Sequence, residues 1–256
     1  MCVDPAYEAA MQALGLPAPE AFARLCADAS GADGRGATAV LSLPGREERL
    51  HWRPCRHGGL LGAWLGDRWL GRGRALRELE VNLLLLRAGA PVPQPLVVAG
   101  VRRGPFWQTA VGTRHLEGAR DGVEVLESSN AGTLPQLAAA AGRALRRFHD
   151  AGGLHPDLHL KNLMLDADGA RAWILDLDRA RPDGPPSPAR RMQEISRLAR
   201  SLLKRGVYGR VGRRGREAFF GAYVEGDARL ARALLDHWPK EQRTIARHAR
   251  RYADPG

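Results

Sequence analysis

The stretch between Gly153 and Arg179 constrains the fold of this chain more than any other, because polar residues flank its two short apolar runs in a specific order. Asp157 follows a His-Pro pair, and Asn162 comes five residues later. An apolar run then leads into a turn, and a second apolar run ends at Asp176. This order predicts a loop that carries Asp157 and Asn162, followed by a β-hairpin that brings Asp176 beside it.

These residue types in this order suit the transfer of a phosphoryl group. A carboxylate such as Asp157 can orient an acceptor hydroxyl, while an amide oxygen and a second carboxylate, here Asn162 and Asp176, can hold Mg²⁺ against the phosphates of a nucleotide. Asp166 and Asp168 lie in the turn and are expected only to shape it. The sequence therefore predicts Asp157, Asn162 and Asp176 as catalytic residues, with Asn162 and Asp176 as the metal ligands.

Three histidines accompany this stretch. His149 is expected to pack beneath the loop, and His155 is expected to brace it rather than to act as a base, because histidine is readily absorbed into hydrogen-bond networks. For His159 two roles stay open, a contact to phosphate and a structural one.

The composition describes an ordinary globular protein with an excess of positive charge. The chain has 256 residues, 44% of them apolar, and a net charge of +11. Residues 190–251 hold 17 Arg or Lys against 6 Asp or Glu, so the excess lies at the C-terminal end. This charge favours an anionic partner. No secretory leader or membrane-spanning run is recognisable, and the three cysteines lie far apart, so we expect a cytoplasmic protein with unpaired thiols.

A glycine-rich segment over residues 31–38 precedes a strand expected at 39–43. Glycine has no Cβ, so Gly34 and Gly36 would let the backbone approach nucleotide phosphates closely. The same segment is also compatible with a simple flexible connector. Gly34 and Gly36 are thus candidate cofactor-binding residues.

The next expected strand, residues 49–53, ends at Arg53, where kinases normally place a phosphate-binding lysine. The chain has no lysine before Lys161. Arginine can hold phosphate through its planar fork of donors. Leucines repeat along one face of a helix expected at 74–88. Glu78 on this helix is the expected ion-pair partner of Arg53, and Glu80 is the alternative partner.

The coarse order of elements predicts an α+β chain. Residues 1–30 read as an N-terminal extension of two short helices, and residues 31–112 as a strand-rich lobe that binds the nucleotide. Residues 113–256 read as a mainly helical lobe with the catalytic loop, the metal site and basic C-terminal helices. The hinge between the strand-rich lobe and the helical lobe is expected near residues 112–122. Residues 205–216, rich in arginine and glycine, are expected to form either an exposed patch that binds an anionic ligand or a solvated basic loop, and the helix before them is expected to begin at Met192.

Several segments together resemble the lipopolysaccharide kinase family, specifically the bacterial kinases that phosphorylate 3-deoxy-D-manno-octulosonic acid (Kdo). The resemblance covers roughly residues 31–205. Its segments are Gly34-Arg35-Gly36-Ala37, Arg53 with Gly58-Gly59, Arg77-Glu78, Pro91-Val92-Pro93-Gln94-Pro95, Thr113-Arg114, the loop of Asp157 and Asn162, Leu175-Asp176-Leu177-Asp178-Arg179, and Arg197-Leu198-Ala199-Arg200-Ser201-Leu202.

The resemblance implies a protein-kinase-like bilobal fold, with an antiparallel sheet and one helix in the N-lobe and a mainly helical C-lobe. It implies ATP and Mg²⁺ as cofactors and a Kdo-lipid A precursor as the acceptor in the lipopolysaccharide inner core. The protein would then be peripheral on the cytoplasmic face of the inner membrane. We expect a monomer that does not bind nucleic acid, since the basic region lacks interleaved aromatics for base stacking.

Two other functions stay open from the sequence. The catalytic loop alone also suits a soluble phosphotransferase of the aminoglycoside or choline type, whose acceptor pocket should be acidic. The missing lysine leaves room for a pseudokinase that binds a nucleotide without transferring its phosphate.

Overall fold

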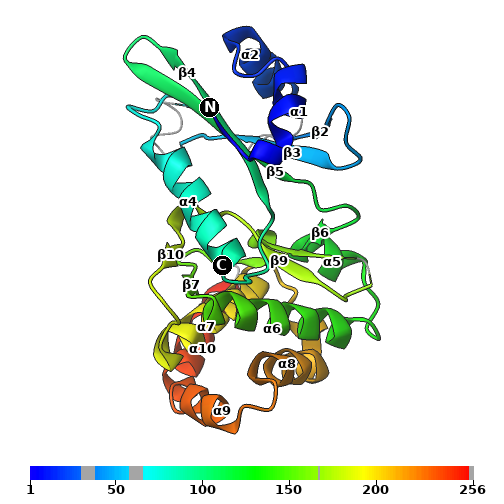
Figure 1. The fold of residues 1–256 in the computed structure, drawn as a ribbon. Helices are drawn as coiled ribbons and strands as arrows, with labels where there is room; N and C mark the ends of the chain where they lie inside the picture. Colours follow the sequence, from blue (N-terminus) through cyan, green and yellow to red (C-terminus); the bar gives the residue numbers. More distant parts are fainter. Residues whose placement is uncertain (30–37, 58–65, 167, 254–256) are drawn as a thin grey trace. The chain divides into compact units, whose positions relative to one another are not determined.

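The computed structural model describes residues 1–29, 38–57, 66–166 and 168–253, and the chain divides into two compact units (Figure 1). Unit 1 comprises Met1–Leu83 and Pro93–Leu116, and unit 2 comprises Leu84–Val92 and Glu117–Gly256. The division after Leu116 lies within residues 112–122, the segment in which the sequence predicts a change from strands to helices. Residues 1–29 belong to unit 1.

Unit 1 is built on a five-stranded antiparallel sheet with the strand order β1-β4-β5-β3-β2 (Figure 1). The strands are β1 (Cys2–Val3), β2 (Ala39–Ser42), β3 (Arg49–Pro54), β4 (Pro95–Arg103) and β5 (Phe106–Arg114). β2 and β3 confirm the strands predicted from the sequence at 39–43 and 49–53. β1 pairs with β4 through Cys2 opposite Val98, and its two residues are too few to show any alternation.

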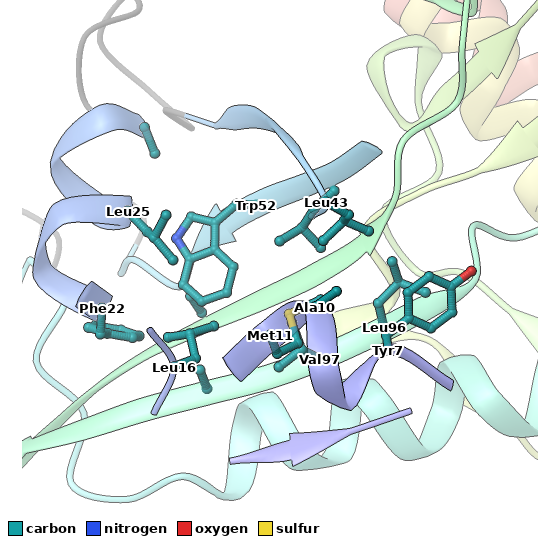
Figure 2. Packing of buried hydrophobic residues seen from close by; sticks show 14 of the residues in the cluster. Tyr7, Ala10, Met11, Leu16, Phe22, Leu25, Leu43, Trp52, Leu96 and Val97 are labelled. Atoms are coloured by element: carbon teal, nitrogen blue, oxygen red, sulfur yellow. The ribbon is translucent and has the colours of Figure 1, made fainter. Parts of the chain in front are cut away.

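One face of this sheet is covered by the N-terminal helices. They are the 3-10 helix η1 (Pro5–Tyr7), α1 (Glu8–Ala13) and α2 (Pro19–Asp28). Figure 2 shows Phe22 and Leu25 beside Trp52, and Met11 beside Val97, within one buried cluster. The Phe22 and Trp52 rings meet edge to face with centroids 5.9 Å apart, a geometry that adds to their burial. The N-terminal helices therefore supply core to unit 1.

The opposite face packs against α4 (Gly73–Arg87). Successive strand residues point to opposite faces, so Val97 lies in the cluster of the N-terminal helices and Val98 in a second cluster with Cys55 and Ala75. On β3 the same alternation places Trp52 on the first face and Arg53 on the side of α4. The sheet thus presents Arg53 to the helix that carries Glu78.

Unit 2 is mainly helical, as expected. Its helices are α5 (Gly122–Ser128), α6 (Leu134–Asp150), α7 (Pro188–Lys204), α8 (Tyr208–Val224), α9 (Ala228–Leu235) and α10 (Trp238–Ala253). α6 packs closely on α8, and a Cβ on Gly142 would collide with the carbonyl of Phe219. No helix in the described part of the chain is both long and apolar enough to cross a bilayer.

Short strands frame the catalytic loop in unit 2. They form two small antiparallel sheets with the orders β6-β8-β9 and β10-β7. The strands are β6 (Arg120–Asp121), β7 (Gly153–Leu154), β8 (Leu163–Leu165), β9 (Ala172–Ile174) and β10 (Arg181–Pro182), and the 3-10 helices are η3 (Leu160–Asn162) and η4 (Leu177–Arg179).

Two boundaries differ from the sequence-based expectation. α7 begins at Pro188 rather than at Met192, because Ser187 caps it and proline is accepted in the first turn of a helix. Of the two expectations for 205–216, the basic loop is wrong in part, since α8 starts at Tyr208. The glycines that suggested a loop act as a local break instead: Gly212 leaves the helical conformation with φ at 61°.

Candidate active site

The loop between β7 and β8 carries Asp157 and Asn162, and the β8–β9 hairpin leads to Asp176. The hairpin pairs Leu163 with Ile174 in antiparallel register. Asp157 and Asp176 are exposed, while Asn162 is buried. The loop and the hairpin that the sequence predicts are therefore both present, and they follow one another directly along the chain.

The turn of the hairpin is built by its own aspartates. The Asp166 carboxylate accepts a hydrogen bond from the Arg171 backbone N–H at 2.8 Å, and the Asp168 carboxylate accepts one from the Ala170 N–H at 3.0 Å. Bonds of this local kind close turns. Asp166 and Asp168 thus have the structural role predicted for them.

His155 holds the predicted catalytic loop against Leu175, which lies between β9 and Asp176. Its Nε2 lies 2.9 Å from the Leu175 carbonyl, and its Nδ1 accepts a hydrogen bond from the Asp157 backbone N–H at 3.2 Å. This arrangement requires the neutral ring with its proton on Nε2. Burial lowers the pKa of His155, although Asp176 and Asp157 oppose the shift. A neutral His155 therefore fixes the backbone of Asp157.

Leu175 joins the loop and the hairpin from the other side. Its N–H donates to the Asn162 carbonyl at 2.9 Å, and its own carbonyl accepts from His155. Both hydrogen bonds lie one residue before Asp176. These backbone hydrogen bonds thereby fix where Asp176 lies in space relative to Asn162 and Asp157.

Asn162 is oriented by the loop that it closes. Its side-chain Nδ2 donates to the Asp157 backbone carbonyl at 3.1 Å. The amide oxygen is left as the remaining polar atom of this side chain, and amide oxygens are ligands that Mg²⁺ accepts. The orientation of Asn162 is therefore compatible with metal binding.

Asp176 has a left-handed backbone, with φ at 59° and ψ at 65°. In the described residues the only other non-glycine residue with positive φ is Glu225, which ends α8. Aspartate tolerates this conformation better than most residues, and such backbone gathers at functional sites. This conformation takes the backbone at Asp176 off the path of a regular strand.

The donor set fits a hard cation. An amide oxygen from Asn162 and a carboxylate from Asp176 match the oxygen ligands that Mg²⁺ takes, with the remaining positions filled by water and phosphate. In the described residues no cluster of three or more His, Cys, Asp or Glu side chains is placed to hold a metal. Asn162 and Asp176 are the residues that would hold Mg²⁺ beside the phosphates of a nucleotide.

His159 lies beside the same carboxylates. Burial lowers the pKa of His159, while the charges of Asp157 and Asp176 act in the opposite direction. These electrostatic contacts place a half-buried imidazole near the centre, so the choice between a phosphate contact and a structural role stays open for this residue.

A buried polar network supports the loop from below. Glu194 on α7 accepts a hydrogen bond from the His155 backbone N–H at 2.6 Å, and its second oxygen lies 3.0 Å from His149 Nε2. His149 Nδ1 lies 2.5 Å from the Tyr223 hydroxyl. Burial lowers the pKa of His149 and raises that of Tyr223. The neutral His149 therefore links α8, α6 and α7 to the catalytic loop.

Glu194 was not predicted from the sequence. The signal was available, since Glu194 lies four residues before Leu198 and therefore on the same face of α7, which is buried. A charged residue on an apolar helix face needs a partner when buried. That partner, the backbone of a loop 39 residues away in sequence, was not recognisable without the fold.

In unit 1, Arg53 and Glu78 form the ion pair predicted for them. The Glu78 side chain is 8% exposed and that of Arg53 is 29% exposed. The rival, Glu80, is exposed on the far side of α4 from the buried residues. Gly34 and Gly36, the predicted phosphate-approach residues, lie outside the described residues.

Comparison with known proteins adds independent findings. The model of the lipopolysaccharide kinase (Kdo/WaaP) family matches residues 32–223. A 3-deoxy-D-manno-octulosonic acid kinase of Vibrio parahaemolyticus is 32% identical over 186 residues, which cover 69% of this chain and 75% of the relative. A kinase of the same description from Xanthomonas oryzae is 32% identical over 175 residues, covering 67% of this chain and 68% of the relative.

Among solved structures, the PK-1 kinase of Cydia pomonella granulovirus is similar to this chain with a TM-score of 0.45 and 11% sequence identity. The similarity covers 75% of this chain and 74% of the viral kinase.

Proposed function

The chain belongs to the lipopolysaccharide kinase (Kdo/WaaP) family, and from this premise we propose that it transfers the γ-phosphoryl group of ATP to a hydroxyl of Kdo in a Kdo-lipid A precursor. The relatives support the acceptor, because those that align over most of their length are kinases of this sugar acid by name. The residues of the loop and hairpin support the reaction.

One observation carries the proposal of phosphoryl transfer. The backbone of Leu175 is hydrogen-bonded to the catalytic loop through both its N–H and its carbonyl, so two exposed carboxylates and one oriented amide are held in one rigid frame. Positioning is most of what a phosphoryl transfer asks of a protein, since the loose transition state leaves little covalent work.

Each residue has a distinct task in this proposal. Asp157 accepts a hydrogen bond from the acceptor hydroxyl and thereby orients the hydroxyl oxygen toward the γ-phosphorus of ATP. Asn162 and Asp176 hold Mg²⁺, which neutralises charge on the phosphates. His155 stays neutral and keeps the Asp157 backbone in place.

Arg53 is proposed to steady the phosphates of ATP in place of lysine. Its pairing with the buried Glu78 limits the conformations of the guanidinium, and a pre-ordered arginine can engage two phosphate oxygens at once. Gly34 and Gly36 are proposed to approach the phosphates through their backbone.

The acceptor also suggests a location. A Kdo-lipid A precursor is an amphiphile, so we propose that the protein works at the cytoplasmic face of the inner membrane as a peripheral, monomeric protein. Its charge of +11 supports attraction to an anionic surface.

The test is a transfer assay with radiolabelled ATP and Mg²⁺ on three acceptors in parallel: a Kdo-bearing lipid A precursor, an aminoglycoside and choline. We expect label on the Kdo-bearing lipid alone. Asp157→Ala should abolish transfer, while Asp168→Ala, which alters an exposed turn carboxylate of the same hairpin, should transfer at nearly the wild-type rate.

Two results would contradict the proposal. Label on an aminoglycoside or choline without label on Kdo would identify a soluble small-molecule phosphotransferase. Binding of ATP without transfer to any acceptor would identify a pseudokinase, in which Arg53 has not replaced the missing lysine.

A further inference from the structure

A segment of unit 1 before α4 is fixed to the β4–β5 hairpin and forms a surface that the catalytic proposal does not use. Trp69 and Trp107 exchange two backbone hydrogen bonds of 2.8 and 2.7 Å. Gln108 donates to the Asp67 carboxylate at 2.7 Å. The segment is therefore an ordered addition to the hairpin. We refer to residues 67–74 and 102–107 together as the Leu70 surface.

The Leu70 surface is strongly cationic. It carries five arginines, all exposed, and one acidic residue. That acidic residue, Asp67, is already hydrogen-bonded to Gln108. The five arginines are Arg68, Arg72, Arg74, Arg102 and Arg103. Such a surface attracts an anionic partner.

An apolar residue projects from the middle of these charges. Leu70 is 86% exposed, whereas the other exposed leucines, Leu84 and Leu235, reach 53% and 54% in the described residues. Single exposed apolar residues are common. A leucine this exposed, between arginines on one ordered loop, matches the pattern by which peripheral proteins enter a bilayer surface.

Both indole rings of the surface are already occupied. His57 stacks on Trp69 with centroids 3.6 Å apart, and the Arg74 guanidinium lies 4.5 Å from the same ring. Arg72 lies 4.7 Å from the Trp107 ring. Binding of single-stranded nucleic acid depends on rings open to bases, so this chemistry favours lipid over nucleic acid.

We propose that the Leu70 surface docks on an anionic lipid bilayer. Leu70 enters the region below the headgroups, while the arginines contact lipid phosphates. The indoles of Trp69 and Trp107 hold Arg74 and Arg72 in place through cation–π contacts. The inference rests on the proposed function in one respect: an acceptor embedded in a membrane gives the enzyme a reason to bind one.

The test is co-flotation of the full chain with vesicles of phosphatidylethanolamine and phosphatidylglycerol, beside vesicles of phosphatidylcholine alone. We expect binding only to the anionic vesicles. Leu70→Asn should weaken it about tenfold, near what is expected for one buried leucine. The pair Arg102→Gln and Arg103→Gln should weaken it roughly thirtyfold, at about a factor of five per arginine.

Matched controls separate this surface from net charge and from exposed leucine in general. Leu235→Asn removes an exposed leucine from α9, and the pair Arg243→Gln and Arg247→Gln removes the same charge from exposed positions on α10. Both controls should bind vesicles within about twofold of the wild type, and Leu70 is exposed enough that its replacement leaves the fold intact.

The kinase assay is run separately, on an acceptor dispersed in detergent, so that its outcome is independent of docking. Leu70→Asn should retain wild-type transfer in detergent and lose it on vesicles. If no transfer occurs in any form but flotation still depends on Leu70, the docking surface stands without the proposed function. Wild-type flotation by both Leu70 surface variants, or binding to single-stranded RNA with no binding to vesicles, would overturn the docking proposal.

Discussion

Asp176 combines an exposed carboxylate with a left-handed backbone, and these two properties can be separated by mutation. Asparagine tolerates the same φ of 59° but lacks the charge. At Asp176 the effect of the backbone conformation on stability can therefore be measured separately from the effect of the charge on catalysis.

We predict that Asp176→Asn lowers kcat by about 100-fold or more, because loss of one group that stabilises transition-state charge costs on that order. Its stability should stay within ~0.5 kcal/mol of the wild type, since the backbone conformation is kept. Steady-state kinetics over a range of Mg²⁺ concentrations and urea denaturation measure the two effects. Wild-type kcat in this variant would show that Asp176 is not a metal ligand.

Substitution of Arg53 is the second test at the level of a single residue. Arg53→Met removes the charge but keeps much of the side-chain length, and it breaks the ion pair with the buried Glu78. We expect KM for ATP to rise at least about tenfold, a change of ~1.4 kcal/mol in binding.

Arg53→Lys is the informative companion, because it restores the charge but not the planar fork. We expect it to recover part of the activity lost in Arg53→Met. If Arg53→Met binds ATP as the wild type does in equilibrium titration, the guanidinium does not contact the nucleotide.

At the scale of elements, the sequence predicted what depends on local pattern. The strand predicted at 49–53 is β3, in which Leu50 and Trp52 are buried while His51 and Arg53 are half-buried. Leucine spacing identified α4, and the ion pair from Arg53 to Glu78 followed from these two elements.

What the sequence did not predict depends on contacts between distant segments. β1 has only Cys2 and Val3 and exists because β4 offers it an edge. The acceptor role of Glu194 exists because α6, α7 and α8 meet beneath the catalytic loop. No local pattern of charge or hydrophobicity carries that information.

Glu194 also gives a prediction at the scale of elements. Its two oxygens accept from His155 and approach His149, so Glu194→Gln puts an amide NH₂ against one of two donors. We expect a loss of ~1–3 kcal/mol in the free energy of unfolding, the cost of leaving a buried polar group unsatisfied. Urea denaturation measures it, and kcat should fall with KM for ATP little changed.

The matched control is Glu217→Gln on α8, whose side chain is 61% exposed and forms an ion pair with Arg213 at the surface. It should change the free energy of unfolding by less than ~0.5 kcal/mol. Equal stability of the two variants would contradict the supporting role given to Glu194.

At the scale of the whole molecule, buried neutral histidines make stability depend on pH. Burial, helped by His115 and Arg53, lowers the pKa of His51 to about 4, and burial also lowers the pKa of His149 and His155. The unfolded chain gains protons on these rings as pH falls below their ordinary pKa of about 6.5, whereas the folded chain does not.

Stability should therefore be highest above that ordinary pKa and should decline as pH falls from about 6.5 toward 4. His51→Asn should reduce the slope of the free energy of unfolding in this range by up to ~1.4 kcal/mol per pH unit. Urea denaturation at pH 7, 6 and 5 measures the slope. An unchanged slope in His51→Asn would mean that His51 is already charged in the folded protein.

We propose that Asp157, Asn162 and Asp176 form a phosphotransfer centre that acts on Kdo. Mass spectrometry of a Kdo-lipid A precursor after incubation with ATP and Mg²⁺ is the decisive measurement, because fragmentation locates the added group. We expect one phosphate on the Kdo fragment with the wild type and with Asp168→Asn, and none with Asp157→Asn. Phosphate on the lipid A fragment instead, or an active Asp157→Asn, would contradict it.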